Sequence, residues 1–216
     1  MRRGYYFFIG ILFIFSFLIF EDVLASSFNF KIPFPNGEKW KITQGYEGDG
    51  WGSGKPTHHS QSKDKYAIDF SIPGEADLGK SVFSSAGGIV RVKQQIRNGR
   101  LTGYGKYVDI EHGNGLISRY AHLLSFSVED GQEVIQGQEI GRVDNTGYQG
   151  GSHLHFAIYQ KDANGKLNPY KPEPMSGYTD FKAGEWYTSD NELYDPNKKV
   201  EPEQPPVTKS WLEKIK

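Results

Sequence analysis

Apolar and polar residues alternate through much of the chain between residues 66 and 159, and this period of two is typical of half-buried β-strands. In the segment 66–70, the large apolar side chains share one face of a strand and Asp69 lies on the other. In the segment 153–159, the apolar side chains again share one face, opposite His153 and His155. Both predicted strands therefore carry polar, chemically active groups on the face that points away from a core.

Five further segments have the composition of strands and are separated by Gly-rich turns: 88–96, 106–111, 116–123, 132–136 and 139–143. The chain contains 26 Gly and 11 Pro, which favours many short strands over long helices. No segment after residue 25 has the apolar spacing of a helix of three turns. The pattern predicts an all-β fold, built mainly from antiparallel sheet.

The first 25 residues have the three-part layout of a secretory signal peptide. Arg2 and Arg3 precede an uncharged run over residues 5–20, and small or apolar residues lead up to Ala25. An uncleaved membrane anchor is the alternative, but this run is shorter than the roughly 18–20 apolar residues that span a bilayer. We expect cleavage after Ala25 and a protein that is secreted or works in the periplasm or cell envelope.

The C-terminal part of the chain is rich in proline and charge. Residues 168–174 include three prolines, and residues 195–207 are Pro-rich and charged, which is typical of a linker or a surface tail. We therefore expect a folded unit over about residues 28–159, with a peripheral segment around Trp186. The predicted organisation is a signal peptide (1–25), an N-terminal lead-in (26–41), a functional domain (42–165) and a Pro-rich C-terminal extension (166–216).

Composition excludes several classes of function. The chain has 25 Lys and Arg against 26 Asp and Glu, so its formal net charge of −1 does not provide the basic surface of a nucleic-acid-binding protein. The absence of cysteine excludes disulfides, thiolate metal ligands and a cysteine nucleophile. Any transition-metal site must therefore be formed from His, Asp and Glu.

His153 and His155 are two residues apart on one predicted strand, so their side chains lie on the same face, about 6–7 Å apart. Imidazole nitrogen and carboxylate oxygen are zinc ligands, and a catalytic zinc site keeps one position for water. Asp69 lies on the polar face of another strand and, with two histidines, would complete three protein ligands. The spacing alone leaves two interpretations open: a metal site, or an exposed pair of strand histidines without a role.

Three motifs occur in order along the chain: HHSQSKDKYAIDF (58–70), SRYAHL (118–123) and GGSHLHFAIY (150–159). Together with the segments between them, they resemble the lysostaphin/LytM-type zinc metallopeptidases over about residues 42–160. The resemblance implies an antiparallel β-sheet with a groove and one zinc ion (Zn²⁺) per chain. It also implies hydrolysis of peptide bonds in bacterial cell-wall peptidoglycan.

The resemblance further implies a role for each residue of the motifs. The implied zinc ligands are His59, Asp69 and His155, and the implied catalytic histidines, which flank the water at the metal, are His122 and His153. The common family pattern places the first histidine four residues before the aspartate, whereas His58 and His59 precede Asp69 by eleven and ten residues. His59 is preferred to His58, because its spacing is nearer to that of a family branch with a longer loop ending in Y-A-x-D-F.

Neighbouring residues complete the predicted site. His122 is expected on the same strand face as Tyr120, which would orient the imidazole or form part of the wall. Tyr46 is a candidate donor to the oxyanion. His112 ends a strand and has no matching role in the resemblance, so we expect it to be structural.

Two positions depart from the common family pattern before the H-x-H motif. Asp144 stands where Gly is usual, and Ser152 stands where Pro is usual. Neither is an implied ligand, so we expect them to reshape the rim of the groove. The glycine-rich segment 47–55 lacks the spacing of a phosphate-binding loop, and we expect a flexible loop that lines the groove.

Three functions are consistent with the sequence. The first is a monomeric, secreted zinc endopeptidase that cleaves peptidoglycan and meets a membrane only through its N-terminal segment. The second is a non-catalytic cell-wall binding module, or a regulator of other murein hydrolases, on the same fold; residues fill all five site positions, which favours the enzyme. The third is a small β-barrel module that binds carbohydrate or a cofactor, with a structural zinc closed by four ligands.

Overall fold

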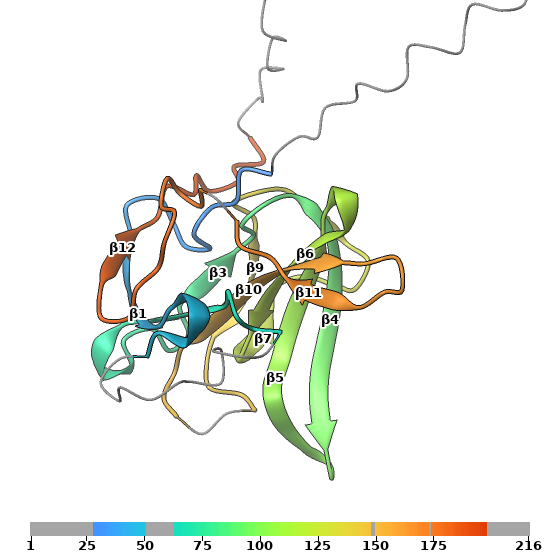
Figure 1. Ribbon diagram of the computed structural model, residues 1–216, viewed down its shortest axis with the longest axis horizontal. Coiled ribbons are helices and arrows are strands. Elements are labelled where there is room, and N and C mark those ends of the chain that lie inside the picture. The colour runs from blue at the N-terminus through green and yellow to red at the C-terminus, as the bar shows by residue number, and fades with distance from the viewer. Residues whose placement is uncertain (1–27, 51–62, 148–149, 173, 198–216) are drawn as a thin grey trace, which may run out of the picture.

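The computed structural model describes residues 28–50, 63–147, 150–172 and 174–197, in which two antiparallel sheets form most of the regular structure (Figure 1). Helical segments of the described chain are single 3-10 turns: η1 (Tyr46–Gly48), η2 (Pro73–Glu75) and η3 (Gly113–Gly115). No helix in these ranges is long and apolar enough to cross a membrane. The predicted all-β, antiparallel fold is confirmed. The predicted signal peptide, residues 1–25, lies outside the described residues.

The larger sheet has nine strands. Eight of them follow one another across it in this order: β12 (Trp186–Thr188), β1 (Lys39–Gln44), β2 (Ile68–Ser71), β10 (Leu154–Lys161), β6 (Leu116–Ala121), β5 (Arg100–Glu111), β4 (Gly88–Arg97) and β8 (Glu133–Val134). The ninth, β11 (Leu167–Pro169), pairs with β10. The smaller sheet has the order β3 (Ser81–Phe83), β9 (Glu139–Val143), β7 (Leu123–Phe126). Figure 1 shows the β4–β5 hairpin extending beyond the rest of the molecule.

Each segment predicted from the alternating pattern contains a strand, but the segment 116–123 is not a single one. It is interrupted at His122, where φ is +62°, and continues as two strands in different sheets, β6 and β7. The pattern does not predict β1, β3, β11 and β12. Three of these four have only three residues, which is too short for an alternation to be recognised.

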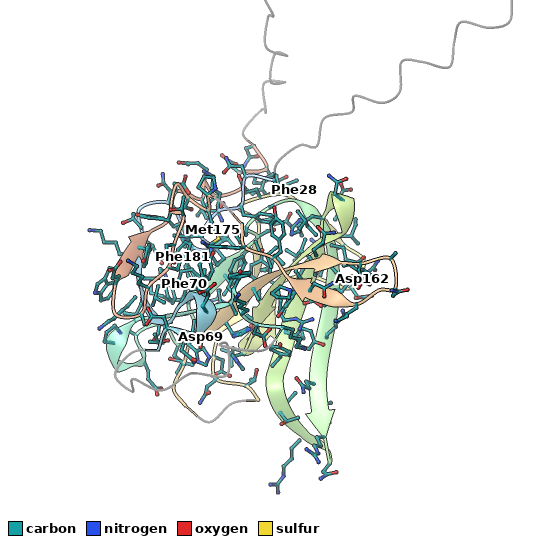
Figure 2. All side chains as sticks on the ribbon, viewed as in Figure 1. Phe28, Asp69, Phe70, Asp162, Met175 and Phe181 are labelled. Atoms are coloured by element: carbon teal, nitrogen blue, oxygen red, sulfur yellow. The ribbon has the colours of Figure 1, made fainter. Side chains whose placement is uncertain are left out.

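The core is formed by apolar side chains from both sheets, and the predicted faces of β2 and β10 are confirmed. Phe70 and Phe156 belong to the main cluster, together with Val82 of β3 and Ile140 of β9. In Figure 2, Phe70, Met175 and Phe181 lie together in the interior, and Asp69 lies below them in this view. Asp69 is thus on the second face of β2, as the alternation requires.

The packed unit extends beyond Tyr159, where the sequence pattern places its end. Met175, Phe181 and Tyr187 are buried in the main core cluster, and β12 forms the edge of the large sheet beside β1. Prolines near these residues limit the length of strands, but they do not prevent aromatic side chains from packing on an existing core. The region around Trp186 is therefore integrated into the sheet through its neighbour Tyr187.

His112 is buried away from the H-x-H motif and has a packing environment of its own. Its Nδ1 lies 2.6 Å from the carbonyl oxygen of Gly87, and its Nε2 lies 2.8 Å from the hydroxyl of Ser118. Because a carbonyl only accepts, Nδ1–H donates to Gly87 and Nε2 accepts from Ser118. Burial lowers the pKa of His112 below the ordinary value of 6.5, and the Gly87 hydrogen bond opposes this shift only in part.

We expect this histidine to make the fold sensitive to acid. Below pH 6.5, His112 binds a proton in the unfolded chain but stays neutral in the folded protein, because its pKa is lower there. Proton binding therefore favours the unfolded state, and the free energy of unfolding decreases as the pH falls below 6.5. Thermal unfolding between pH 5 and pH 8 should give a melting temperature that decreases toward pH 5. A His112→Gln variant should be less stable at pH 8, and its melting temperature should depend less on pH than that of the wild type. If the two proteins showed the same pH dependence, groups other than His112 would cause it.

Candidate active site

Asp69 and His155 are brought together by the pairing of β2 with β10. The two residues are direct partners in the antiparallel register, and both are at least 98 % buried. Asp69 Oδ1 lies 2.9 Å from His155 Nδ1. Two atoms that each carry a lone pair approach this closely only with a proton or a cation between them. The 2.9 Å separation is that of an N–H···O hydrogen bond. A tetrahedral zinc ion with bonds of about 2.0–2.1 Å separates two of its N or O ligands by about 3.3 Å, so the two side chains would bind one ion after moving slightly apart.

The second carboxylate oxygen of Asp69 is fixed by Gln44, the last residue of β1. Gln44 is the partner of Asp69 in the β1–β2 register, next to an irregularity that follows Ile42. Its Nε2 donates a hydrogen bond of 2.6 Å to Asp69 Oδ2. This contact holds the carboxylate so that Oδ1 faces His155. Sequence reasoning missed Gln44, because the residue stands at a strand end without a motif.

His122 and His153 differ from His155 in the hydrogen bonds of their rings. The Nδ1 of His122 lies 2.9 Å from the carbonyl oxygen of Thr146, and the Nδ1 of His153 lies 2.9 Å from that of Gly151. Both Nδ1 atoms must therefore donate, and a neutral ring then carries its lone pair on Nε2. The rings of His122 and His153 are 4.6 Å apart between centroids, and His122 is 5.9 Å from the ring of His155. The structure thus brings four of the five predicted site residues into one place.

The position of His122 depends on its left-handed backbone. In β6, Ala121 pairs with His155 and Tyr120 pairs with Phe156, so the strand alternation would place residue 122 on the core face. With φ at +62°, His122 instead joins the other two histidines. This conformation is uncommon for residues other than Gly, although Asn, Asp and His adopt it more often than most. The expected shared face with Tyr120 is wrong. Tyr120 is fully buried on the core side, where its hydroxyl accepts from the backbone N–H of Ser85.

Backbone contacts hold the turn at His122 in place. The His122 N–H donates to the carbonyl oxygen of Tyr104, and the His122 carbonyl accepts from the N–H of Asp144. Thr146, which binds the ring of His122, lies against Gly105, where a Cβ would be only 2.1 Å from the Thr146 carbonyl oxygen. Gly105 also has a φ of +60°, so glycine is required for this close approach of β5 to the segment that orients the imidazole.

The environment of His122 keeps its ring neutral. Burial, followed by the neighbouring rings of His153 and His155, lowers the pKa of His122 to about 3. With its proton on Nδ1, the neutral ring carries its lone pair on Nε2, which is therefore the nitrogen that can accept a hydrogen bond.

Asp64 is a further buried carboxylate of the site, and sequence reasoning missed it. Both of its oxygens accept from the hydroxyl of Tyr104 (2.8 and 2.7 Å), and Oδ1 also accepts from Tyr159 (2.5 Å). Asp64 Oδ1 lies 4.0 Å from His155 Nε2. Burial favours the neutral acid, but the nearby imidazole and the two hydroxyls outweigh it, and the pKa of Asp64 lies below its ordinary value of 3.8.

Ser152 and Asp144 connect the segment before the H-x-H motif to the rest of the site. The hydroxyl of Ser152 donates to the fully buried carboxylate of Asp77, whose other oxygen accepts from the N–H of Ile72 after β2. Asp144 forms an isolated bridge with His153. The expectation that both residues affect the groove rim stays a prediction, but their contacts position the backbone on either side of His153.

The first zinc ligand and the oxyanion donor both stay predictions. His58 and His59 lie in the segment 51–62, outside the described residues, so the choice between them stays a prediction. Tyr46 packs edge-on against Tyr66 and Phe181 and belongs to the main core cluster. Its role as an oxyanion donor also stays a prediction.

The donors of this site are chemically suited to zinc. Within the described ranges, no three His, Asp or Glu side chains form a group that could hold a metal ion. Asp69 and His155 bring one carboxylate oxygen and one imidazole nitrogen together, and both are donor types that zinc accepts. The segment 51–62, which contains the remaining candidates, immediately precedes the described part that leads into β2.

Comparisons with known proteins find related peptidases. Residues 63–169 match the model of Peptidase family M23. The chain is 33 % identical over 129 residues to the peptidoglycan DD-endopeptidase ShyA of Vibrio cholerae, covering 58 % of this chain and 26 % of ShyA. It is 41 % identical over 103 residues to the DD-carboxypeptidase/endopeptidase Mpg of Neisseria meningitidis, covering 47 % of this chain and 21 % of Mpg. The matches thus span about a quarter of the length of these relatives.

A solved structure of a zinc-containing peptidase from Vibrio cholerae is also similar. Its sequence identity is 26 % and its TM-score 0.44, over 65 % of this chain and 39 % of that one.

Proposed function

This chain belongs to peptidase family M23 through its residues 63–169, and from that premise we propose that it is a zinc-dependent endopeptidase that hydrolyses peptide bonds in bacterial cell-wall peptidoglycan. The zinc ligands in this proposal are His59, Asp69 and His155, with His58 as the alternative first ligand, and one zinc ion binds per chain. The relatives whose names specify peptidoglycan or DD-endopeptidase activity support the choice of substrate.

A difference between the histidines carries the proposal. His155 directs Nδ1 at the Asp69 carboxylate, whereas His122 and His153 use Nδ1 to donate to backbone carbonyls. In His155 a ring nitrogen thus lies beside a carboxylate oxygen, and these are two donor types that zinc accepts. In His122 and His153 the Nδ1–H bonds leave Nε2 of a neutral ring as the acceptor, which suits the proposed bases, and the resemblance to the family supports this division of roles.

The chain's own residues then have defined tasks in hydrolysis. When bound, zinc would polarise the scissile carbonyl and increase the acidity of water. His122 and His153 would accept a proton at Nε2 from the attacking water and return it to the leaving amine. Their protonated forms would also stabilise negative charge on the substrate oxygen, and Thr146 and Gly151 hold both rings in orientation.

Two alternatives make different predictions. A non-catalytic binding module on this fold would bind peptidoglycan without releasing products, and it would have no need of the buried, neutral His122. A structural zinc would need a fourth protein ligand. We infer that the protein is secreted or acts in the cell envelope, because its proposed substrate lies outside the cytoplasm. We also expect a monomer.

A digest of purified peptidoglycan tests the proposal directly. Mass spectrometry of the soluble fragments should show newly exposed amines and carboxyls at one type of peptide bond, and it would identify the bond. Binding to peptidoglycan without release of fragments would instead favour the non-catalytic module.

Metal removal is expected to abolish hydrolysis and lower the melting temperature. A ligand that binds only the native state adds RT ln(1 + [L]/Kd) to stability, about 4 kcal/mol at a thousand times Kd. Differential scanning calorimetry with and without chelator should detect the shift, and zinc should restore both properties. An enzyme that is fully active after complete removal of zinc would contradict the proposal.

A further inference from the structure

The buried carboxylate of Asp64 lies on the side of His155 that faces away from Asp69. Asp69 Oδ1 contacts Nδ1 of the ring, and Asp64 Oδ1 is 4.0 Å from Nε2. These two nitrogens lie on different edges of an imidazole, so one ion bound at Nδ1 beside Asp69 cannot also reach Asp64. Asp64 is therefore not a further ligand of the same metal.

The tautomer of His155 determines whether its Nδ1 can bind a metal. A neutral imidazole that binds zinc through Nδ1 must carry its proton on Nε2. In the metal-free ring Asp69, 2.9 Å from Nδ1, favours a proton on that nitrogen, and zinc would replace this proton. Asp64, 4.0 Å from Nε2, favours the tautomer that zinc needs, since a carboxylate attracts the N–H and repels a lone pair. Metal-binding histidines commonly have such a partner, which sets both the orientation and the basicity of the ring.

Asp64 is itself held in position by a buried assembly. The hydroxyls of Tyr104 and Tyr159 donate to it, and the backbone N–H of Ala67 donates to its carbonyl oxygen. The guanidinium of Arg119 lies 4.6 Å from the ring centroid of Tyr104 and 5.1 Å from that of Tyr159. The guanidinium thus packs against both tyrosine rings and restricts the positions of their hydroxyls.

Arg119 is anchored in turn by a buried ion pair. Its Nε and one terminal nitrogen donate to the two carboxylate oxygens of Asp109 on β5, at 2.7 and 2.8 Å. A bidentate pair allows little rotation of the guanidinium. The position of the Asp64 carboxylate thus depends on a series of contacts that starts at Asp109 on β5, two strands from His155 on β10.

We propose that Asp64 is a positioning residue for the metal centre: held by Tyr104 and Tyr159, it keeps the proton of His155 on Nε2 and so presents Nδ1 to the zinc ion. This inference rests on the proposed zinc-peptidase function and adds to it a residue outside the ligand and catalytic sets.

The substitution Asp64→Asn tests this role with almost no change in shape. The single amide oxygen would keep the place of Oδ1, which accepts from both tyrosine hydroxyls and lies nearest to His155. The amide has no negative charge, so the attraction that favours a proton on Nε2 of His155 would be lost. We expect the zinc Kd, measured by competition with a chromophoric chelator, to rise about 10–100-fold. Tyr104→Phe, which keeps the carboxylate but removes one donor, should give a smaller increase. Asp162→Asn, on the exposed turn between β10 and β11, is the matched control and should leave the Kd unchanged.

Zinc affinity separates this inference from the proposed function, because it requires no hydrolysis. A folded Asp64→Asn protein with wild-type zinc affinity would overturn the positioning role even if the wild type cleaves peptidoglycan. Weaker zinc binding in this variant would support the role even if no cleavage were found. If Asp64→Asn does not fold, Tyr104→Phe decides, and an unchanged Kd in that variant would count against the proposal.

Discussion

His155→Ala is expected to release zinc and to abolish peptidase activity. The side chain supplies one of three proposed ligands, and its removal leaves Asp69 buried without the partner of its Oδ1. Metal analysis of the purified variant should give well below one zinc per chain. Peptidoglycan digestion should give no soluble fragments above background.

His153→Ala and His122→Ala are the matched comparisons, since they lie within the same cluster of imidazoles. Both variants should retain about one zinc per chain but lose about 10²–10⁴-fold in turnover, because proton transfer and charge stabilisation are removed. If His153→Ala lost zinc and His155→Ala retained it, the two roles would be exchanged. Retention of both zinc and activity in all three variants would refute the zinc-peptidase proposal.

The second large effect concerns stability. Arg119→Met is expected to lower the free energy of unfolding by about 3 kcal/mol, because Asp109 stays buried after its bidentate partner is removed. We choose the lower end of the usual range for a broken buried pair, since Lys93 Nζ still lies 3.0 Å from Asp109. Urea denaturation followed by tryptophan fluorescence measures this change.

Two control variants test the cause of this destabilisation. Arg91→Met removes an ion pair with Glu111 on the same β4–β5 hairpin, but both side chains are more than one-third exposed, so little change is expected. Combining Arg119→Met with Asp109→Leu removes both buried charges and should recover part of the loss. If the double variant were clearly less stable than Arg119→Met alone, the unpaired charge of Asp109 would not be the cause of the destabilisation.

The faces of the strands that carry the site could be predicted from the sequence. The alternation in 66–70 and 153–159 placed Asp69 and His155 opposite the core, and the structure confirms both faces. That these two side chains meet was not implied by alternation, because a period of two defines a face and not a neighbour. Only the pairing of β2 with β10 in one particular register makes them direct partners.

His122 and Asp64 show why other parts of the site required the structure. The sequence pattern extended a strand through His122, since the modest preference of histidine for positive φ does not override an alternation. Contacts with Tyr104, Thr146 and Asp144 determine this conformation. Asp64 stands between two lysines and has the local composition of a solvated surface. It is buried because Tyr104 and Tyr159, 40 and 95 residues away in the chain, donate to it.

The sequence by itself therefore determined the class of the fold, the faces of its central strands and the residue types available for the site. These properties follow from local periodicity and composition, which depend on neighbours in the chain. The tertiary structure decided which polar groups contact one another, which nitrogen of each histidine carries its proton, and which carboxylates are buried. Those properties depend on strand register and on hydrogen bonds between residues far apart in sequence, because the environment of each group exists only after the sheets have packed.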